Sequence, residues 1–428
     1  MFAHQCRRGR RRALTVVTSF VLLLARARAD GPLGPSSDER WDEAVDADIS
    51  YDVRISDPTW VVPSGALPAG INVQDSNNNL SIAFHAGRLF LAWRTAPTHF
   101  ASVQARLYVM SSADLGRSWT RETEIALGRD LREPFLLEVG GRLRLYFAEL
   151  GGNAWAFEPR ALWRCERVGG RWTQPERWKE AREIAWDFKV RRGRAWMTSY
   201  VGKGYEVRGG PVQLHFRSSV DGLGWADVEQ DPVYQGGVTE AAFEFEPGGR
   251  LWAVTRDEDG DATGFGSHVV TAEADRPGRW QFPLRADPNR YDSPRMFRHG
   301  ADLYVVARRD LAATPIGERM SIMPTSLRKL FLWPAYSLRP KRTALYRLDK
   351  RTRSLVPLVD LPSAGDTAFP SIARLGPDTY LIANYTSPLE SGGASWLRGQ
   401  LGRTGIYLVT LRFVPRPGDD PVRRASAR

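Results

Sequence analysis

Acidic and basic side chains recur at matching places along this sequence. Glu240 precedes Arg256 by sixteen residues, and Asp292 stands in the same relation to Arg308, with mostly apolar residues between them. A carboxylate can act as a base or a nucleophile, and a guanidinium can hold an anion through two parallel hydrogen bonds. Two facing carboxyl groups are also what the cleavage of a glycosidic bond commonly requires. The pattern therefore indicates a polar site, which repeated structural elements would have to assemble.

A strand–turn–strand phrase that occurs six times could supply these elements. The copies lie at residues 80–94, 134–149, 187–200, 241–256, 293–308 and 369–385. Each has an apolar stretch, a glycine-containing turn and a second apolar stretch, which is typical of a β-hairpin. Six copies with a period of about fifty residues predict an all-β fold, a six-bladed β-propeller of four-stranded antiparallel blades. A β-sandwich with a chance repeat is the alternative.

The remaining segments fit this architecture. A third apolar strand follows each hairpin, and residues 51–62 can complete the last blade and close the ring. We expect a signal peptide at 1–29, an N-terminal linker at 30–50, the propeller at 51–415 and a flexible tail at 416–428. Residues 175–183 form the one stretch with the periodicity of an amphipathic helix.

The N-terminal residues have the pattern of an export signal. Arginines precede a short apolar run at 13–25, and Ala27-Arg28-Ala29 provides a small-x-small cleavage site. The run is short for a stable membrane span, so an uncleaved anchor is the weaker alternative. The arginine pair before Ala13 also fits a twin-arginine route. We expect a secreted or periplasmic protein.

Charge and cysteine content exclude several classes of function. Removal of residues 1–29 removes seven arginines and lowers the formal net charge from +11 to +4, so a nucleic-acid partner is not implied. Only Cys165 would remain, which excludes an intramolecular disulfide and a zinc site built on cysteines. Asp257, Asp259 and Asp261 lack the following glutamate of a calcium loop. We therefore expect no metal and no cofactor.

The hairpin topology places the charged strand ends on one face. The first strand of each hairpin begins where the second ends, so these ends would meet at the mouth of the central channel. The residues ahead of the first strands are Asn78, Arg132, Glu133, Asp187, Glu240, Asp292 and Asp366, and those at the ends of the second strands include Arg94, Tyr200, Arg256, Arg308 and Asn384. Charged strand ends are common on protein surfaces. Polar residues recur at the same position of successive hairpins, however, and this favours a ring-shaped polar site. His99, in a loop on this face, is interpreted as a loop histidine.

The turns after the third strands carry a family resemblance. Ser112-Ala-Asp114-Leu-Gly116-Arg-Ser118-Trp119 fits the Asp-box pattern S-x-D-x-G-x-[ST]-W, and a shortened version begins at Ser219. The Asp side chain can hydrogen-bond the turn amides while the Trp packs between outer sheets. The motif resembles the sialidase superfamily of six-bladed propellers. TEAAFEFEPGGRLWAVTR, around Glu240 and Arg256, resembles the sialidase blade with a catalytic Glu and one of three arginines that bind the sugar carboxylate.

The resemblance implies roles for Glu240 and Arg256, and the phase of the repeat extends the site to the other residues. Glu240 would act as base or nucleophile activator, with Asp292 or Asp187 as the partner acid. Arg94, Arg256 and Arg308 would bind an anionic group, and Arg132, Glu133 and Asp366 would contact the substrate. Arg132-Glu133-Pro134-Phe135 also resembles the Arg-Asp-Pro element of five-bladed glycosidases.

Two features depart from the sialidase pattern. The nucleophilic Tyr of the family aligns best with Phe369, so Tyr385 would have to replace it. Residues 79–83 stand where the family has an Arg-Ile-Pro element.

The sequence is compatible with three functions. The first is an exported glycoside hydrolase acting on a glycan, whose sugar could be acidic. The second is a propeller that binds a glycan or a protein without turnover, and the third is a polysaccharide lyase. The insertion 311–340, with Arg328, Lys329, Phe331, Trp333 and Tyr336, could cover a sugar or form a flap that touches a membrane or a partner. The oligomeric state is open.

Overall fold

The structure is a computed structural model that describes residues 37–45, 49–154, 157–179, 182–202, 211–229, 231–319 and 322–416. The chain divides into two compact units, Met1–Pro32 and Leu33–Arg428, and every described residue belongs to the second. The expected signal peptide and nearly all of the expected C-terminal tail lie outside the described residues.

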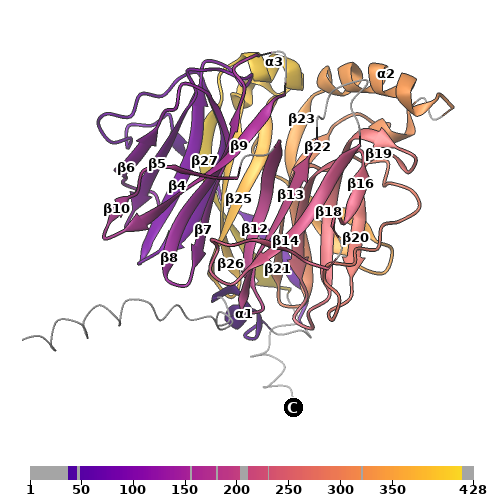
Figure 1. Ribbon diagram of the computed structural model, residues 1–428, viewed down its shortest axis with the longest axis horizontal. Coiled ribbons are helices and arrows are strands. Elements are labelled where there is room, and N and C mark those ends of the chain that lie inside the picture. The colour runs from indigo at the N-terminus through magenta and orange to yellow at the C-terminus, as the bar shows by residue number, and fades with distance from the viewer. Residues whose placement is uncertain are drawn as a thin grey trace, which may run out of the picture. The chain divides into compact units, whose positions relative to one another are not determined.

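Six antiparallel blades make up the second unit (Figure 1). The first three blades follow the chain in order. Their strands are β3 (Ser76–His85), β4 (Arg88–Ala96), β5 (Arg106–Ser112) and β6 (Thr120–Ile125); β7 (Asp130–Val139), β8 (Arg142–Leu150), β9 (Pro159–Val168), β10 (Arg171–Trp172) and β11 (Glu176–Lys179); and β12 (Glu183–Arg191), β13 (Arg194–Val201), β14 (Val212–Ser219), β15 (Ala226–Asp227) and β16 (Tyr234–Gly236).

The last three blades have the same construction. Their strands are β17 (Val238–Phe245), β18 (Leu251–Asp261), β19 (Gly264–Gly266) and β20 (Val269–Ala272); β21 (Asp292–His299), β22 (Asp302–Asp310), β23 (Lys341–Asp349) and β24 (Ser354–Asp360); and β25 (Thr367–Gly376), β26 (Thr379–Thr386) and β27 (Gly405–Pro415). The innermost strands β3, β7, β12, β17, β21 and β25 contact one another in a closed cycle. The predicted six-bladed propeller is therefore confirmed.

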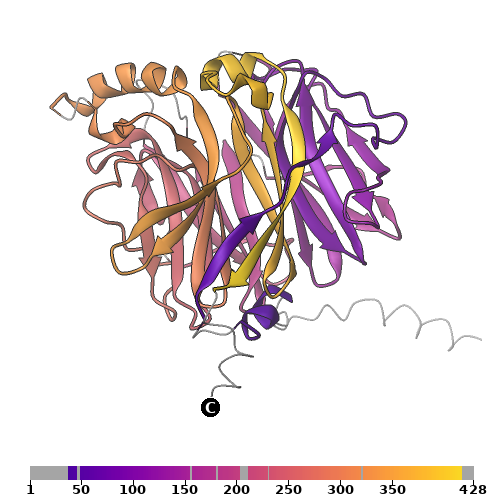
Figure 2. The ribbon, with the colours of Figure 1, turned by 180° about the vertical axis from the view of Figure 1, so that it is seen from behind.

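The ring is closed by strands from opposite ends of the sequence. β1 (Tyr51–Ile55) and β2 (Thr59–Val62) both pair with β27, so the N-terminal strands complete the last blade. Figure 2 shows the indigo N-terminal strand beside the yellow C-terminal one. This confirms the sequence-based placement of residues 51–62. The hydrogen bonds of β1 and β2 tie the first residues of the propeller to its last strand, and these N-terminal strands form the outer edge of the closing blade.

Two expectations about local structure differ from what the structure shows. Residues 176–179, expected to be helical, form strand β11 at the edge of the second blade and pair with β9. As a strand at the edge of the blade, this segment forms backbone hydrogen bonds with β9. A short isolated helix would have no such partner and would be marginally stable. Part of the expected linker also docks on the propeller as α1 (Ser37–Asp42), where Asp42 pairs with Arg298 and Arg374.

The remaining helices lie on the propeller face opposite α1 (Figure 1). They are η1 (Ile316–Glu318) and α2 (Thr325–Ser337) between β22 and β23, and η2 (Leu389–Ser391) and α3 (Trp396–Leu401) between β26 and β27. In the described part of the chain, no helix has the length and apolar content needed to cross a membrane.

The turn that matches the Asp-box pattern is held by side-chain hydrogen bonds. Asp114 Oδ1 accepts the amide of Ser118 at 2.9 Å and Asp114 Oδ2 accepts its hydroxyl at 2.6 Å. Trp119 is buried in the largest hydrophobic cluster. A side chain at Gly116, where φ is +93°, would meet Leu408 of the neighbouring blade at 2.7 Å. The turn therefore locks two blades together and lies away from the channel mouth.

Candidate functional site

Each innermost strand has an irregularity at the position of the candidate residues. The inner hairpins shift register between Asn78 and Leu80, Arg132 and Phe135, Ala185 and Asp187, Val238 and Ala241, Asp292 and Arg295, and Ala368 and Ser371. Residues at several of these bulges have positive φ, including Asn79 (43°), Glu133 (51°) and Ser293 (52°). A bulge re-aims side chains and is frequent beside functional sites. A backbone bulge that is repeated in the six inner hairpins therefore positions the predicted ring of polar residues.

Three arginines converge on the carboxylate of Asp292. Arg290 Nε lies 2.7 Å and Arg256 Nε 3.2 Å from Asp292 Oδ1, and Arg308 Nη1 lies 3.4 Å from Asp292 Oδ2. Burial alone would raise the pKa of Asp292, but the three guanidiniums hold it well below its usual range. Asp292 therefore remains ionised, which suits a structural counter-ion better than a proton donor.

Glu240 lies on the other side of Arg256. Its Oε1 accepts Arg256 Nη1 at 2.6 Å and its Oε2 accepts the amide of Ser293 at 2.6 Å. Arg256 Nη2 also donates to Glu258, which Arg290 approaches at 3.3 Å. Burial raises the pKa of Glu258 to about 7. The predicted Glu240–Arg256 pair is thus a direct ion pair within a larger network that joins the fourth and fifth blades.

A second network surrounds Asp366. Its Oδ1 accepts the hydroxyl of Tyr385 at 2.9 Å and Nε1 of Trp396 at 3.0 Å. His99 Nδ1 lies 2.6 Å from Asp366 Oδ2, so the expected loop histidine is part of a buried contact. Burial, followed by the negative charge of Asp366, raises the pKa of Tyr385 well above its usual value. A phenol in this state is a poor substitute for the missing tyrosine nucleophile.

Arg94 and Arg132 share one carboxylate partner. Arg94 Nη2 lies 2.7 Å from Asp130 Oδ1, and Arg132 Nε lies 2.5 Å from Asp130 Oδ2. Arg94 is completely buried and also contacts Asn78 Oδ1 at 3.4 Å. The predicted anion-binding arginines Arg94, Arg256 and Arg308 therefore each have a carboxylate partner inside the protein.

Glu133 has a different environment. Its side chain is only partly buried, and Glu133 Oε1 accepts Asn79 Nδ2 at 3.1 Å. Burial, assisted by the nearby negative charge of Glu240, raises the pKa of Glu133 to about 8. A carboxyl group with this pKa is largely protonated at neutral pH. Among the predicted site residues with carboxyl groups, Glu133 is the one whose side chain is not fully buried, and its raised pKa lets it hold a proton.

Asp187 differs from the other predicted site residues because it lines a cavity. It pairs with Lys189 at 3.2 Å, and the cavity has a volume of about 640 Å³. The cavity is also lined by Trp41 of α1 and by Arg295, whose guanidinium lies 4.5 Å from the ring centroid of Trp186. This hollow thus belongs to the α1 end of the channel and does not contain the other predicted site residues.

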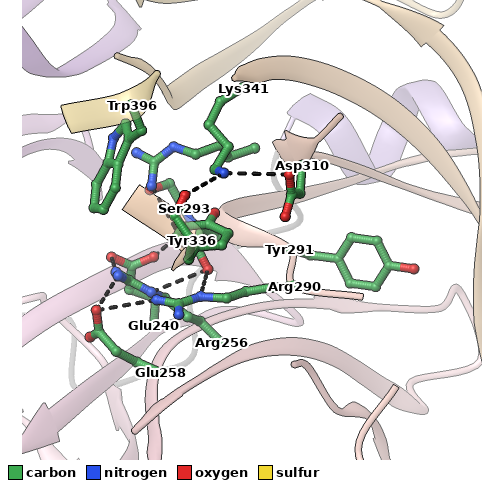
Figure 3. A network of polar contacts seen from close by, with 12 residues as sticks. Glu240, Arg256, Glu258, Arg290, Tyr291, Ser293, Asp310, Tyr336, Lys341 and Trp396 are labelled. Atoms are coloured by element: carbon green, nitrogen blue, oxygen red, sulfur yellow. Dashed lines mark hydrogen bonds and ion pairs between the residues drawn. The ribbon is translucent and has the colours of Figure 1, made fainter. Parts of the chain in front are cut away.

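Helices α2 and α3, on the face opposite α1, cover the predicted mouth of the channel (Figure 1). Tyr336 of α2 lies 4.3 Å from the guanidinium of Arg290 (Figure 3). Trp396 of α3 lies 4.7 Å from the guanidinium of Arg308. These two rings pack with Phe265, Ile316 and Leu332 into a small core. The exposed fractions of Arg94, Asp187, Glu240, Arg256, Asp292, Arg308, Asp366 and Tyr385 lie between 0% and 4%. Tyr336 and Trp396 act as a roof over the charged network.

Two other groups have side chains of metal-binding type within the described residues. Asp257, Asp261 and His268 form one, and His215, Asp227 and Asp231 form the other. Asp261 already accepts four hydrogen bonds, and both ring nitrogens of His268 contact threonine hydroxyls. In the second group, Asp227 pairs with Arg217 and His215 with Asp231. Neither group presents a set of free ligand atoms.

The sequence did not single out several residues of these networks. They are Asp130, Glu258, Arg290, Arg295, Lys341 and Trp396. Arg290 is only two residues from Asp292, and that proximity is the one signal that could have identified it. The partners Asp130 and Trp396 come from other blades and loops, so only the folded ring brings them to Arg94 and Asp366.

Comparisons with known proteins agree on the fold. A protein of unknown function from Dyadobacter fermentans superposes with a TM-score of 0.58 and 14% identity, over 85% of this chain and 99% of that one. A sialidase from Trypanosoma rangeli gives 0.52 and 15%, over 83% and 57% of the two chains. An endosialidase from phage phi92 gives 0.54 and 9%, over 86% and 70%. The fold is that of the sialidase-like propellers.

Sequence comparison adds no closer relationship. No protein-family model and no curated protein matches the chain. The sialidase-like propeller described here spans little more than half of the Trypanosoma rangeli chain. At these identities the likeness establishes architecture, and the chemistry has to be argued from the side chains themselves.

Proposed function

We propose that this sialidase-like propeller is an exported glycoside hydrolase, in which Glu133 donates a proton and Glu240 is the opposing carboxylate. The observation that carries the proposal is the contrast between these two groups at the channel mouth. Glu133 is partly exposed and its pKa is raised to about 8, whereas Glu240 is held by Arg256 and the amide of Ser293. Carboxyl groups with opposed environments are a pattern of glycosidase sites.

The protein residues would divide the reaction between them. Neutral Glu133 would protonate the oxygen of the leaving sugar, and Glu240 would stabilise positive charge at the anomeric carbon or activate a water molecule. Asp292 and Asp366 are poorly suited to the donor role, because their neighbours hold both pKa values below the usual range in spite of burial. Their arginine and histidine partners instead support the shape of the site.

The charge distribution favours a neutral sugar over an acidic one. Arg94, Arg256 and Arg308 are buried and each is paired with a carboxylate of the chain. An anionic sugar would have to displace Asp130, Glu240 or Asp292 from these pairs, which leaves a buried charge uncompensated. The N-terminal signal pattern supports export, so the substrate would be a glycan outside the cytoplasm.

A second candidate function is the binding of a glycan or a protein without turnover. The roof formed by Tyr336 and Trp396 favours it, because the charged network beneath that roof is nearly inaccessible. In this case Glu133 and the rim of the channel would contact the ligand, and no bond would be cleaved.

The test is release of reducing sugars from a panel of neutral and acidic glycans. We expect Glu133→Gln and Glu240→Gln to lower the rate at least about 100-fold, as loss of general acid–base catalysis does. Glu176→Gln, which removes an exposed carboxylate on the outer edge of the same blade as Glu133, should retain the wild-type rate. Equal rates for all variants would refute the assignment. Tight glycan binding without any product would establish the second candidate instead.

A further inference from the structure

The cavity at the α1 end of the central channel has mostly apolar walls. We call it the channel cavity. Five of the six blades and α1 contribute to its lining, and the apolar lining residues include Trp41, Ile82, Phe135, Phe188, Met296 and Ile372. The ring centroids of Phe135 and Phe188 lie 4.8 Å apart, so these two side chains form one aromatic wall. The volume of about 640 Å³ falls within the range of roughly 300–1,000 Å³ that is usual for small-molecule sites.

Arg295 lines the channel cavity without a carboxylate partner. It is 8% exposed, and in the described part of the chain no carboxylate oxygen lies within ion-pair distance of its guanidinium. Arg295 Nη1 donates to the carbonyl of Pro294 at 3.4 Å. The Nε and Nη2 groups have no acceptor among the described residues, and they are not sealed from the cavity. The guanidinium therefore offers free donors to a molecule in the cavity.

Aromatic rings fix the orientation of this guanidinium. Its central carbon lies 4.5 Å from the ring centroid of Trp186 and 5.5 Å from that of Phe135. Trp186 is itself held by a hydrogen bond from its Nε1 to the carbonyl of Pro294 at 3.3 Å. A guanidinium whose face packs on a ring keeps its edge for hydrogen bonds. Such an edge can bind a carboxylate through two parallel N–H donors.

Other cations that line the channel cavity are already neutralised by the chain. Lys189 pairs with Asp187 at 3.2 Å, Arg191 with Glu244 at 2.9 Å and Arg374 with Asp42 at 2.5 Å. Glu138 also lines the cavity, but its side chain is only half-buried and so stays hydrated. These pairs leave the positive charge of Arg295 as the one that a ligand can neutralise without displacing a carboxylate from Lys189, Arg191 or Arg374.

The buried charge of Arg295 is only partly compensated within the protein. Burial lowers the pKa of Arg295, and the charges of Asp187, Glu133 and Glu240, which lie beyond ion-pair distance, offset this effect only in part. A buried charge without a close partner carries a cost in free energy that a bound anion would remove.

We propose that the channel cavity binds a small organic monocarboxylate with an apolar body. The ligand carboxylate accepts the free N–H groups of Arg295, and the body packs against Phe135 and Phe188. One unpaired guanidinium matches one negative charge, and apolar walls favour a ligand that is not hydrated along its whole surface. Neither Glu133 nor Glu240 lines the cavity, so this site is separate from that of the proposed hydrolase.

The experiment is a ligand-detected NMR titration of the whole chain with benzoate, which combines one carboxylate with an aromatic body. Benzyl alcohol keeps the body without the charge, and formate keeps the charge without the body. We expect benzoate to bind at least about tenfold more tightly than either, because each of them lacks one of the two contacts.

Two variants test the site from different sides. Arg295→Met removes the guanidinium but keeps an apolar side chain beside Trp186, and we expect it to weaken benzoate binding at least about tenfold. Its thermal stability without ligand should not fall, because no ion pair is broken. Ala373→Phe leaves Arg295 in place and fills part of the cavity that Ala373 lines, so it should weaken benzoate binding by a similar factor.

The matched control is an arginine outside the cavity. Arg285→Met makes the same change in charge at an exposed loop residue that does not line the cavity. It should retain the wild-type affinity for benzoate within about twofold.

Several results would overturn the proposal. They are no saturable binding of benzoate, equal binding of benzyl alcohol or formate, wild-type affinity in Arg295→Met or Ala373→Phe, or an equal loss in Arg285→Met. Equal binding of formate would identify a site for any small anion instead. Because the titration uses no glycan, its failure and the failure of the proposed hydrolase activity are separate outcomes.

Discussion

The charges at the channel mouth are arranged as an internally neutralised network. Asp292 faces Arg256, Arg290 and Arg308, and Asp366 faces His99, Tyr385 and Trp396. A buried carboxylate surrounded by donors is stabilised only while all of its partners remain. Individual residues of this network therefore contribute to folding as much as to any chemistry at the mouth.

Replacement of Asp292 tests this role directly. Asp292→Asn keeps the shape of the side chain, but it leaves Arg308 buried without its carboxylate partner and removes one of the carboxylates that face Arg256 and Arg290. We therefore expect a loss of about 3–5 kcal/mol in the free energy of unfolding. Denaturation in urea measures the loss. Asp302→Asn, an exposed position in the same hairpin, should change the value by less than about 0.5 kcal/mol.

The pH dependence of Asp292 provides a second measurement of the same network. Its folded-state pKa is depressed, so its contribution to stability is present above the unfolded value of 3.8 and is lost as the pH falls toward the folded value. The stability of Asp292→Asn should therefore fall less steeply than that of wild type below about pH 4. Identical acid profiles for the two proteins would contradict the network.

Glu133 should have the opposite dependence. Its folded-state pKa of about 8 lies above the ordinary value of 4.5, so the folded state binds the proton more tightly than the unfolded chain. The contribution is fully present below pH 4.5 and is lost as the pH rises to about 8. Glu133→Gln cannot ionise and should be more stable than wild type at pH 9, as judged by thermal unfolding. A wild-type profile that is flat from pH 5 to 9 would refute the raised pKa.

At the scale of elements, α1 connects three blades beneath the channel. Arg191 of the third blade pairs with Asp38 at 3.0 Å, and Asp42 pairs with Arg298 of the fifth blade and with Arg374 of the sixth. Six residues are too few for a stable isolated helix. The helix therefore exists because the propeller supplies partners for its carboxylates, and in return it covers one end of the channel.

Removal of one of these carboxylates should loosen α1. Asp42→Ala leaves Arg298 and Arg374 buried without their carboxylate partner, and we expect a loss of about 3–5 kcal/mol together with faster proteolysis near residue 45. Thermal unfolding and limited trypsin digestion measure the two effects. Glu43→Ala, the exposed neighbour, should match wild type in both; if it were equally destabilised, the ion pairs of Asp42 would not be the cause.

At the scale of the whole molecule, the closing seam joins the two ends of the propeller into one ring. The amide of Ser56 donates to the carbonyl of Thr410 at 2.9 Å, and that of Arg416 donates to Ser50 at 2.9 Å. In an antiparallel ladder every second residue pair is hydrogen-bonded. Arg54 lies opposite Arg412, two residues from Ser56, so this pair belongs to the same hydrogen-bonded set as Ser56 with Thr410. Interruption of β1 at this point would weaken the contact between the two ends of the ring.

A proline at position 54 tests the seam. Arg54→Pro removes one backbone donor from the β1–β27 ladder, and we expect it to cost at least about 1 kcal/mol and to lower the urea midpoint. Arg54→Ala removes the same exposed side chain but keeps the donor, so it should behave as wild type. Equal midpoints for the two variants would show that the β1 ladder does not hold the ring closed.

The sequence by itself determined the architecture. Alternating apolar stretches and turn glycines specify hairpins locally, and their sixfold recurrence leaves a propeller as the way to bury all of their faces. The phase of the repeat also identified Glu240, Arg256, Asp292 and Arg308 as neighbours, because residues at the same place in each hairpin must meet at one end of the channel. Counting the strands of each blade also predicted that residues 51–62 complete the last blade and close the ring.

Only the tertiary structure decided how these residues are used. Asp130 reaches Arg94, and Trp396 reaches Asp366, across loops whose conformation no local pattern encodes. The helix α2 escaped prediction because its apolar side faces outward, the reverse of the usual amphipathic pattern. Burial and charge in the folded ring raise the pKa of Glu133 and depress that of Asp292. Ionisation depends on distance and dielectric environment, and these exist only once the chain has folded.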